Sequence, residues 1–142
     1  MFFYFLPILM IVASNVVYNI CQKSTPQSAN PFTALFITYL TAAILTLIAY
    51  QFHSSEKGFV QSITDLNWTS LVLGVSIVGL ELGYLLAYRA GWNISIGSLV
   101  ANILLALALI PVGILFYHEG FDTSKTVGVV FCIIGLLLIN RL

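Results

Sequence analysis

The sequence predicts an all-α integral membrane protein, a bundle of about five transmembrane helices, and three observations carry this prediction. Of its 142 residues, 60% are hydrophobic and 7% are charged, whereas a soluble domain carries roughly 25% charged residues. The mean hydropathy of +1.03 lies far on the apolar side. Five apolar stretches approach the roughly 20 residues that a spanning helix needs, and backbone groups in hydrocarbon must be paired inside such helices. We therefore expect one transmembrane domain over residues 1–142, in a multi-pass protein of the cell membrane, of the inner-membrane type.

Turn and capping residues mark the boundaries of the first three predicted helices. The N-terminal stretch lacks a basic leader and a cleavage site, so it is interpreted as a helix and not as a signal peptide. Pro26 and Pro31 are expected to stop the first helix and to open the second. Asn67 is expected to cap the third helix, ahead of Trp68 as an interfacial anchor. The predicted helices cover residues 2–22, 32–52, 68–89, 95–117 and 124–139.

The later boundaries follow the same rules. Arg89 lies at the C-terminal end of the third helix, where a cation interacts favourably with the helix dipole. Pro111 is expected to kink the fourth helix, and Gly120 is expected to end it. Either Asp122 or Thr123 is expected to cap the fifth helix. The connection between the third and fourth helices is short, which predicts that they are antiparallel neighbours.

The basic residues give little information on orientation. Lys and Arg total five, and five spans place three of them on one side of the membrane and two on the other. This split barely favours an N-terminus outside the cell under the positive-inside rule. We therefore consider a dual-topology, antiparallel homodimer, beside the alternative of one fixed orientation with weak charge signals. The residues are Lys23, Lys57, Arg89, Lys125 and Arg141.

Glu81 is the strongest candidate for a functional residue, because it lies well inside the third predicted span. A carboxylate there costs at least a few kcal/mol on insertion scales, so it is expected to face the bundle interior or water. Helical spacing puts Tyr84 and Tyr88 on the same stripe. A carboxylate flanked by phenols suits a polar or cationic ligand, and it can also bind and release a proton. The alternative is an interhelical hydrogen bond that only stabilises the fold.

Three asparagines lie within predicted spans. Asn15 and Asn19 are four residues apart and share a face of the first helix, and Asn102 lies in the fourth helix. Their amides can line a substrate path, or they can pair helices by hydrogen bonds. Gly79 and Gly83 form a GxxxG pair, which predicts a close contact between helices.

No constellation typical of an enzyme is present in the sequence. It contains no His/Cys metal cluster, no GxSxG motif and no phosphate-binding loop. The formal net charge is zero, so nothing suggests electrostatic binding of nucleic acid. We expect no enzymatic activity, no catalytic or metal-binding residues, and no cofactor.

The C-terminal half resembles the drug/metabolite transporter superfamily, in particular the EamA-like domain. In that family a short turn joins two helices, a helix rich in small residues follows, and an acidic residue ends it before a last helix with spaced glycines. The corresponding positions are Ala90–Asn93, Gly97–Ala101, Glu119, Gly128 and Gly135. Five helices fit one half of such a transporter, and typical members hold two halves in inverted orientation. The resemblance therefore implies a short member that dimerises, with the two copies antiparallel.

The small multidrug resistance family is a looser relative. Its hallmark is a glutamate in the middle of the first helix, a few residues before a lysine. Placing Lys23 on that lysine puts Asn15 at the acidic position. The aromatic pair of the penultimate helix has no equivalent near Asn102 either. Proton-coupled export of aromatic cations therefore does not carry over from this family.

The leading functional hypothesis is a secondary transporter for a small polar or amphipathic metabolite. Two copies would enclose a cavity and alternate access by rocking against each other. One alternative is proton-coupled efflux of hydrophobic cations. A second alternative is a membrane subunit that transports nothing and only orients a partner. The substrate or proton would be bound by residues among Glu81, Tyr84, Tyr88, Asn15, Asn19 and Asn102.

Overall fold

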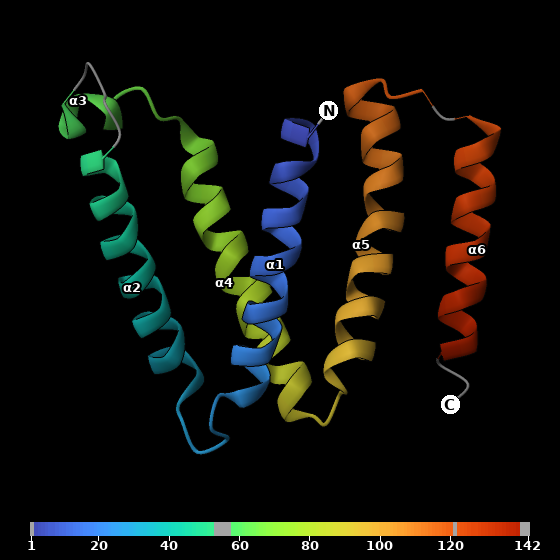
Figure 1. The fold of residues 1–142 in the computed structure, drawn as a ribbon, viewed down its shortest axis with the longest axis horizontal. Helices are drawn as coiled ribbons and strands as arrows, with labels where there is room; N and C mark the ends of the chain where they lie inside the picture. Colours follow the sequence, from blue (N-terminus) through green and yellow to red (C-terminus); the bar gives the residue numbers. More distant parts are fainter. Residues whose placement is uncertain (1, 53–57, 121, 140–142) are drawn as a thin grey trace. The chain divides into compact units, whose positions relative to one another are not determined.

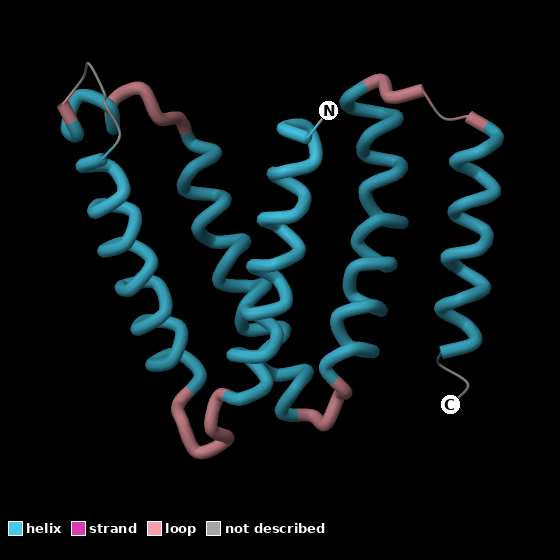
Figure 2. The backbone as a smooth tube through the Cα atoms, viewed as in Figure 1, coloured by secondary structure: helices cyan, strands magenta, loops and turns pink. Residues whose placement is uncertain are grey.

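The computed structural model describes residues 2–52, 58–120 and 122–139 and is helical, with no strand in these segments (Figure 2). Each of the five predicted helices is present, and a further helix of five residues, α3, lies between the second and third. The all-α prediction is thereby confirmed. The helices, shown in Figure 1, are α1 (Phe2–Ser24), α2 (Pro31–Phe52), α3 (Phe59–Ile63), α4 (Trp68–Arg89), α5 (Ile94–Tyr117) and α6 (Thr123–Ile139).

Four of these helices, α1, α2, α4 and α5, are long and apolar enough to cross a membrane. The fifth predicted span, α6, is apolar but has 17 residues, which corresponds to about 25 Å of helix. This length lies at the lower limit for a spanning helix, roughly 17–25 residues. Crossing of the membrane by α6 therefore stays a prediction.

The chain divides into two compact units, which we call the N-terminal unit (Met1–Ala90) and the C-terminal unit (Gly91–Leu142). In the N-terminal unit, α4 packs against both α1 and α2. Leu85 and Tyr88 on α4 are buried, as is Leu35 on α2. In the C-terminal unit, α5 packs against α6.

The starts of α2 and α4 follow the sequence signals. Pro31 is the first residue of α2, where its missing N–H costs no helical hydrogen bond. Asn30 caps this helix, since its Oδ1 accepts from the N–H of Phe32 at 2.9 Å. Asn67 caps α4 as predicted, and its Oδ1 accepts from the N–H of Thr69 at 3.0 Å.

The end of α5 at Tyr117 agrees with the predicted range of 95–117, but Gly120 is not the residue that terminates the helix. The helical hydrogen bonds stop at Tyr117, and His118 adopts a left-handed conformation with φ 52°. The backbone N–H groups of His118 and Glu119 both donate to the carbonyl oxygen of Gly113, the latter at 3.0 Å. These bonds satisfy a carbonyl group that the helix end would otherwise leave unpaired.

The start of α6 is capped by Asp122, one of the two residues that the sequence left open. Its Oδ1 accepts from the N–H of Thr123 at 2.6 Å, and its carbonyl oxygen accepts from the N–H of Thr126 at 3.1 Å. Pro111 lies inside α5 and does not end this helix. The same holds for Pro7 inside α1.

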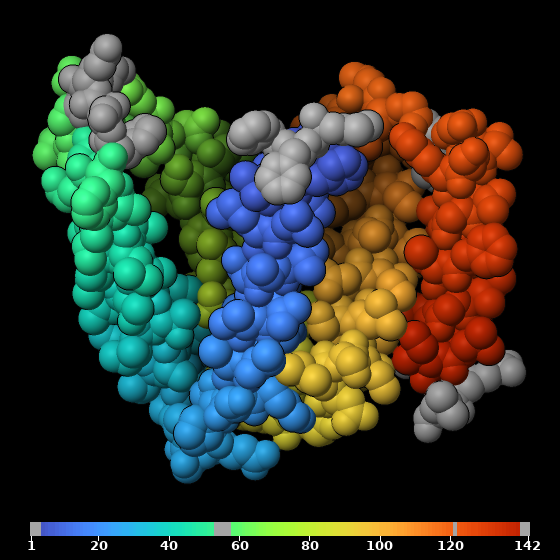
Figure 3. All heavy atoms as spheres, in the orientation of Figure 1, coloured from blue at the N-terminus to red at the C-terminus, as the bar shows by residue number. Residues whose placement is uncertain are grey.

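Most large apolar side chains are exposed along the helices, as expected for surfaces that face lipid. Leu9 and Ile44 are examples on α1 and α2, whose surfaces Figure 3 shows in blue and cyan. Gly79 and Gly83 are exposed too, and an added Cβ at either would meet nothing within 4 Å. The expected close contact at the GxxxG pair is therefore not made by the residues that the structure describes.

Candidate functional site

The end of α4 is tied to the loop between α1 and α2 by Arg89. Its Nη2 donates to the carbonyl oxygens of Pro26, at 3.0 Å, and Ala29, at 2.8 Å. Figure 1 shows this loop and the C-terminal end of α4 at the same end of the N-terminal unit. Arg89 therefore does more than interact with the helix dipole, because it fixes which ends of the three helices meet.

Lys23 makes a second contact at this end. Its Nζ donates to the carbonyl oxygen of Tyr88 at 3.3 Å and lies 5.7 Å from the centroid of the Tyr88 ring. A cation over an aromatic ring at this distance is attracted by the negative face of the ring. The last turn of α1 is thereby joined to the last turn of α4.

One turn deeper, three of the residues predicted for the site form a hydrogen-bonded chain. Asn19 is buried, and its Nδ2 donates to Oδ1 of Asn15 at 2.9 Å and to the Asn15 carbonyl oxygen at 2.8 Å. The hydroxyl of Tyr88, which is also buried, donates to Oδ1 of Asn19. This chain joins α1 to α4, which is the pairing role that the sequence left open for the asparagines.

A row of aromatic rings lies beside this chain. Tyr84 lies between Tyr18 and Tyr88, with centroid distances of 5.7 Å to Tyr18, edge to face, and 6.0 Å to Tyr88. Gln22 donates from its Nε2 to the Tyr18 hydroxyl at 3.3 Å. Tyr18 was not predicted as a site residue, although it lies three residues from Asn15 and so on the same side of α1.

Glu81 lies on α4, farther from its C-terminal end than Tyr84 and Tyr88, and it is half-buried. Its Oε2 is buried and has no hydrogen-bond partner among the described residues, and the hydroxyl oxygen of Tyr39 on α2 is in the same situation. The Glu81 carboxyl interacts electrostatically with both Tyr39 and Tyr18. A buried polar atom without a partner costs about 1–3 kcal/mol. Glu81 is therefore not explained by a hydrogen bond that stabilises the fold.

A small cavity of about 100 Å³ lies between the three helices of the N-terminal unit. This volume is enough for roughly three water molecules. Its walls combine polar and apolar groups from α1, the loop after it, α2 and α4, namely Tyr18, Cys21, Gln22, Thr25, Ala34, Leu35, Thr38 and Leu85.

Asn102 is the predicted site residue that lies in the C-terminal unit. It is exposed, and its Nδ2 donates within α5, to the carbonyl oxygen of Ser98 at 2.8 Å and to the Ser98 hydroxyl at 3.3 Å. Within the N-terminal unit, the structure thus brings Asn15, Asn19, Tyr84 and Tyr88 into contact.

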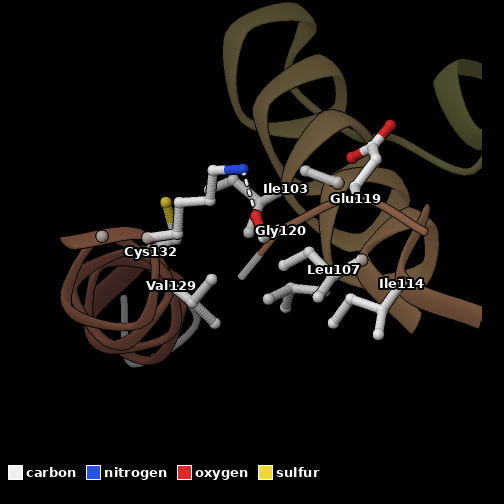
Figure 4. Close-up of a pocket in the computed structure, with 11 residues that line it drawn as sticks. Ile103, Leu107, Ile114, Glu119, Gly120, Val129 and Cys132 are labelled. Carbon is white, nitrogen blue, oxygen red and sulfur yellow. Dashed lines mark hydrogen bonds between the residues drawn. The ribbon is translucent and has the colours of Figure 1, made fainter. Parts of the chain in front are cut away.

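The C-terminal unit has a larger cavity of about 350 Å³ between α5 and α6 (Figure 4). Its walls are mainly apolar and include Ile103, Leu107 and Val129. At its rim, Nζ of Lys125 donates to the carbonyl oxygen of Gly120 at 2.6 Å. In the part of the chain that the structure describes, no group of three or more His, Cys, Asp or Glu side chains could hold a metal ion.

Helices long and apolar enough to span a membrane, with a carboxylate and several phenols on them, have the features of a membrane transport protein, since acids inside the membrane mark substrate and ion pathways. Residues 2–141 match the model of the EamA-like transporter family, and the chain belongs to this family. The resemblance seen in the C-terminal half is thereby confirmed over nearly the whole chain. Membership makes the protein a membrane transporter of the drug/metabolite kind. Comparison with curated proteins and with solved structures gives no match.

Proposed function

We propose that this protein is a secondary transporter that moves a small polar or amphipathic metabolite across the cell membrane by alternating access. The observation that carries the proposal is Glu81, whose Oε2 is buried among spanning helices without a partner. A stable fold gains nothing from such an atom, and functional sites are where unfavourable polar groups are retained. Substrate and proton would then compete for the Glu81 carboxyl.

The rest of the proposed site follows from the helices around Glu81. Tyr84 offers a hydroxyl and an aromatic face one turn away on the same helix. Asn15, Asn19 and Tyr88 hold α1 against α4 and so set the distance between the groups that contact substrate. Movement of the substrate requires this arrangement to open on one side of the membrane at a time.

The active form that we propose is a homodimer, because family transporters are built from two related halves and five helices correspond to one half. An antiparallel pair would reproduce the inverted repeat, in which two copies rock about a shared site. The small bias in basic residues is compatible with insertion in both orientations.

Efflux of hydrophobic cations is a second candidate, favoured by the aromatic row. The centroid of the Tyr84 ring lies 5.7 Å from that of Tyr18 and 6.0 Å from that of Tyr88. Aromatic faces next to a carboxylate stabilise an organic cation by cation–π attraction. The two candidates differ in whether lipophilic cations or polar metabolites are carried.

The proposal is tested with purified protein in liposomes, using a panel of labelled metabolites and lipophilic cations at several pH values. Glu81→Gln is expected to lower uptake at least about tenfold, because a hydrogen bond to a charged group is worth roughly 1.5–3 kcal/mol. Glu119→Gln, which alters an exposed acid of the C-terminal unit, is the matched control and is expected to transport normally. Equal uptake by wild type and Glu81→Gln at every pH would refute the role of Glu81. Absence of uptake with any compound, together with a second polypeptide that co-purifies at fixed stoichiometry, would favour a non-transporting subunit.

A further inference from the structure

Tyr39 on α2 and Glu81 on α4 lie at the same depth in the N-terminal unit. Tyr39 is eight residues after Pro31, where α2 begins, and Glu81 is eight residues before Arg89, where α4 ends. These two helix ends meet at one side, because Arg89 donates to carbonyl oxygens of the loop that precedes α2. A rise of 1.5 Å per residue places both side chains about 12 Å from that end.

Tyr18 joins the same layer from α1. It lies six residues before the end of α1 at Ser24, and thus about 9 Å from the same side. Its ring contacts that of Tyr84, edge to face, at 5.7 Å. The layer therefore receives a carboxylate from α4 and phenols from α1, α2 and α4.

Two polar atoms of this layer have no partner. Oε2 of Glu81 and the hydroxyl oxygen of Tyr39 are both buried, and neither has a hydrogen bond among the described residues. Buried polar atoms in native proteins are nearly always paired, so two unpaired oxygens at one depth point to a ligand that supplies the missing groups. Both oxygens can accept a hydrogen bond, and one of them belongs to a carboxylate.

The chemistry of the two acceptors restricts the ligand. A primary ammonium group has three N–H donors and a positive charge, so it can bond to both oxygens and neutralise the carboxylate. A neutral hydroxyl brings one donor and no charge. A quaternary ammonium group brings charge and no donor, and it would leave both oxygens unpaired.

We propose that Glu81 Oε2 and the Tyr39 hydroxyl together bind the primary ammonium group of the transported molecule, with the Tyr18 and Tyr84 rings against its carbon skeleton. This inference rests on the proposed function and adds to it a substrate class and a residue on α2. Tyr39 is the residue that distinguishes a primary amine from its trimethylated analogue, because its oxygen accepts one of the N–H bonds that methylation removes.

Binding is measured by calorimetry on the purified full-length protein, with 2-phenylethylammonium and its N,N,N-trimethyl analogue as probes. Wild type is expected to bind the primary amine at least about tenfold more tightly, since a site built for hydrogen bonds rejects an analogue without donors. Tyr39→Phe is expected to weaken the primary amine about five- to tenfold and to change the affinity of the trimethyl analogue less than twofold. This variant removes an oxygen without a partner, so it should fold, and its unfolding temperature checks this.

Tyr50→Phe is the matched control, because it removes a hydroxyl from the same helix eleven residues away, and it is expected to bind both probes as wild type does. Equal weakening of both probes by Tyr39→Phe would overturn the proposal, as would wild-type protein that binds the two probes equally or binds neither at millimolar concentration. Uptake into liposomes separates this outcome from failure of the proposed function. A protein that transports metabolites but does not discriminate the amines refutes the ammonium site alone, whereas one that discriminates the amines without any flux refutes transport.

Discussion

In the N-terminal unit, polar side chains of α1 form hydrogen bonds to α4, between helices. In the C-terminal unit, the side chain of Asn102 bonds within its own helix and that of Lys125 bonds to the loop beside its helix. Asn19 and Tyr88 are 69 residues apart in sequence and connect two helices, whereas Asn102 bonds four residues back to Ser98. The same residue types therefore have different consequences in the two units. Polar contacts join α1 to α4 in the first unit, whereas the contact of Asn102 in the second unit stays within α5.

The two units also differ in what stays unpaired. Glu81 in the N-terminal unit retains a buried oxygen without a partner, while Glu119 in the C-terminal unit is exposed beside a helix end. Of these two acids, Glu81 is the one with an unfavourably buried oxygen. It lies in the unit where its carboxyl interacts with the phenols of Tyr18 and Tyr39. This difference is why the ligand site is proposed there and not at the larger apolar cavity between α5 and α6.

The largest effect on stability is expected at Glu81. Glu81→Leu should raise the free energy of unfolding by roughly 1–3 kcal/mol, because it removes a buried oxygen without a partner. Thermal and denaturant unfolding in detergent micelles, followed by circular dichroism, would measure the change. Glu119→Leu is the control in the other unit and should stay within about 0.5 kcal/mol of wild type. A lower free energy of unfolding for the Glu81→Leu variant than for wild type would show that the carboxyl stabilises the fold.

The next effect concerns the hydrogen bond between Asn19 and Tyr88. A double-mutant cycle with Asn19→Ala and Tyr88→Phe should give a coupling energy of about 0.6–1.7 kcal/mol, the range for polar contacts between membrane helices. The matching cycle in the C-terminal unit, Ser98→Ala with Asn102→Ala, should give about 0.2–0.5 kcal/mol, since that pair lies on one helix. Equal coupling in both cycles would remove the distinction between the units.

Removing the guanidinium of Arg89 should have a local effect. Arg89→Gln loses the donors to the carbonyl oxygens of Pro26 and Ala29, at a cost of about 1 kcal/mol for the loop. The amide of Ala29, which donates to Pro26 at 3.1 Å, should then exchange its hydrogen roughly five times faster. The amide of Glu119 in the other unit should be unaffected. Unchanged exchange at Ala29 would mean that the loop holds its conformation without Arg89.

The extent of the helices could be predicted from the sequence because length and apolar composition decide it. Residues 68–89 were predicted as a helix and form α4, and the capping roles of Asn67 and Asp122 followed from their side chains. The five-residue helix α3 was missed, since so short a segment has no detectable periodicity. The end of α5 at Tyr117 was predicted, but Gly120 was wrong as the terminating residue, because the left-handed residue is His118, which carries no sequence signal comparable to glycine.

The candidate site was predictable only in part. Glu81 was identified because a charged residue within an apolar span is unusual whatever the fold. Tyr39 was not, because a tyrosine in an apolar helix has no signal of its own, and its importance depends on sharing a depth with Glu81 across two helices. The role of Arg89 was underestimated for a similar reason. Its acceptors are backbone carbonyls 60 and 63 residues away, and such partners leave no pattern in side-chain sequence.

The smallest effect is expected at Gly113 in the C-terminal unit, where two contributions oppose each other. Alanine in a helix interior is favoured over glycine by about 0.5–1 kcal/mol. However, a Cβ at Gly113 would lie 2.8 Å from Oε2 of Glu119, whose backbone is held by its bond to the Gly113 carbonyl. The carboxylate must rotate away, so Gly113→Ala alone should change stability by less than about 0.5 kcal/mol. In a Glu119→Ala background the same substitution should give the full gain, measured by thermal unfolding. An equal gain in both backgrounds would mean that the Glu119 carboxylate does not contact α5 at Gly113. The acid of the C-terminal unit would then be less constrained by its surroundings than Glu81 is in the N-terminal unit.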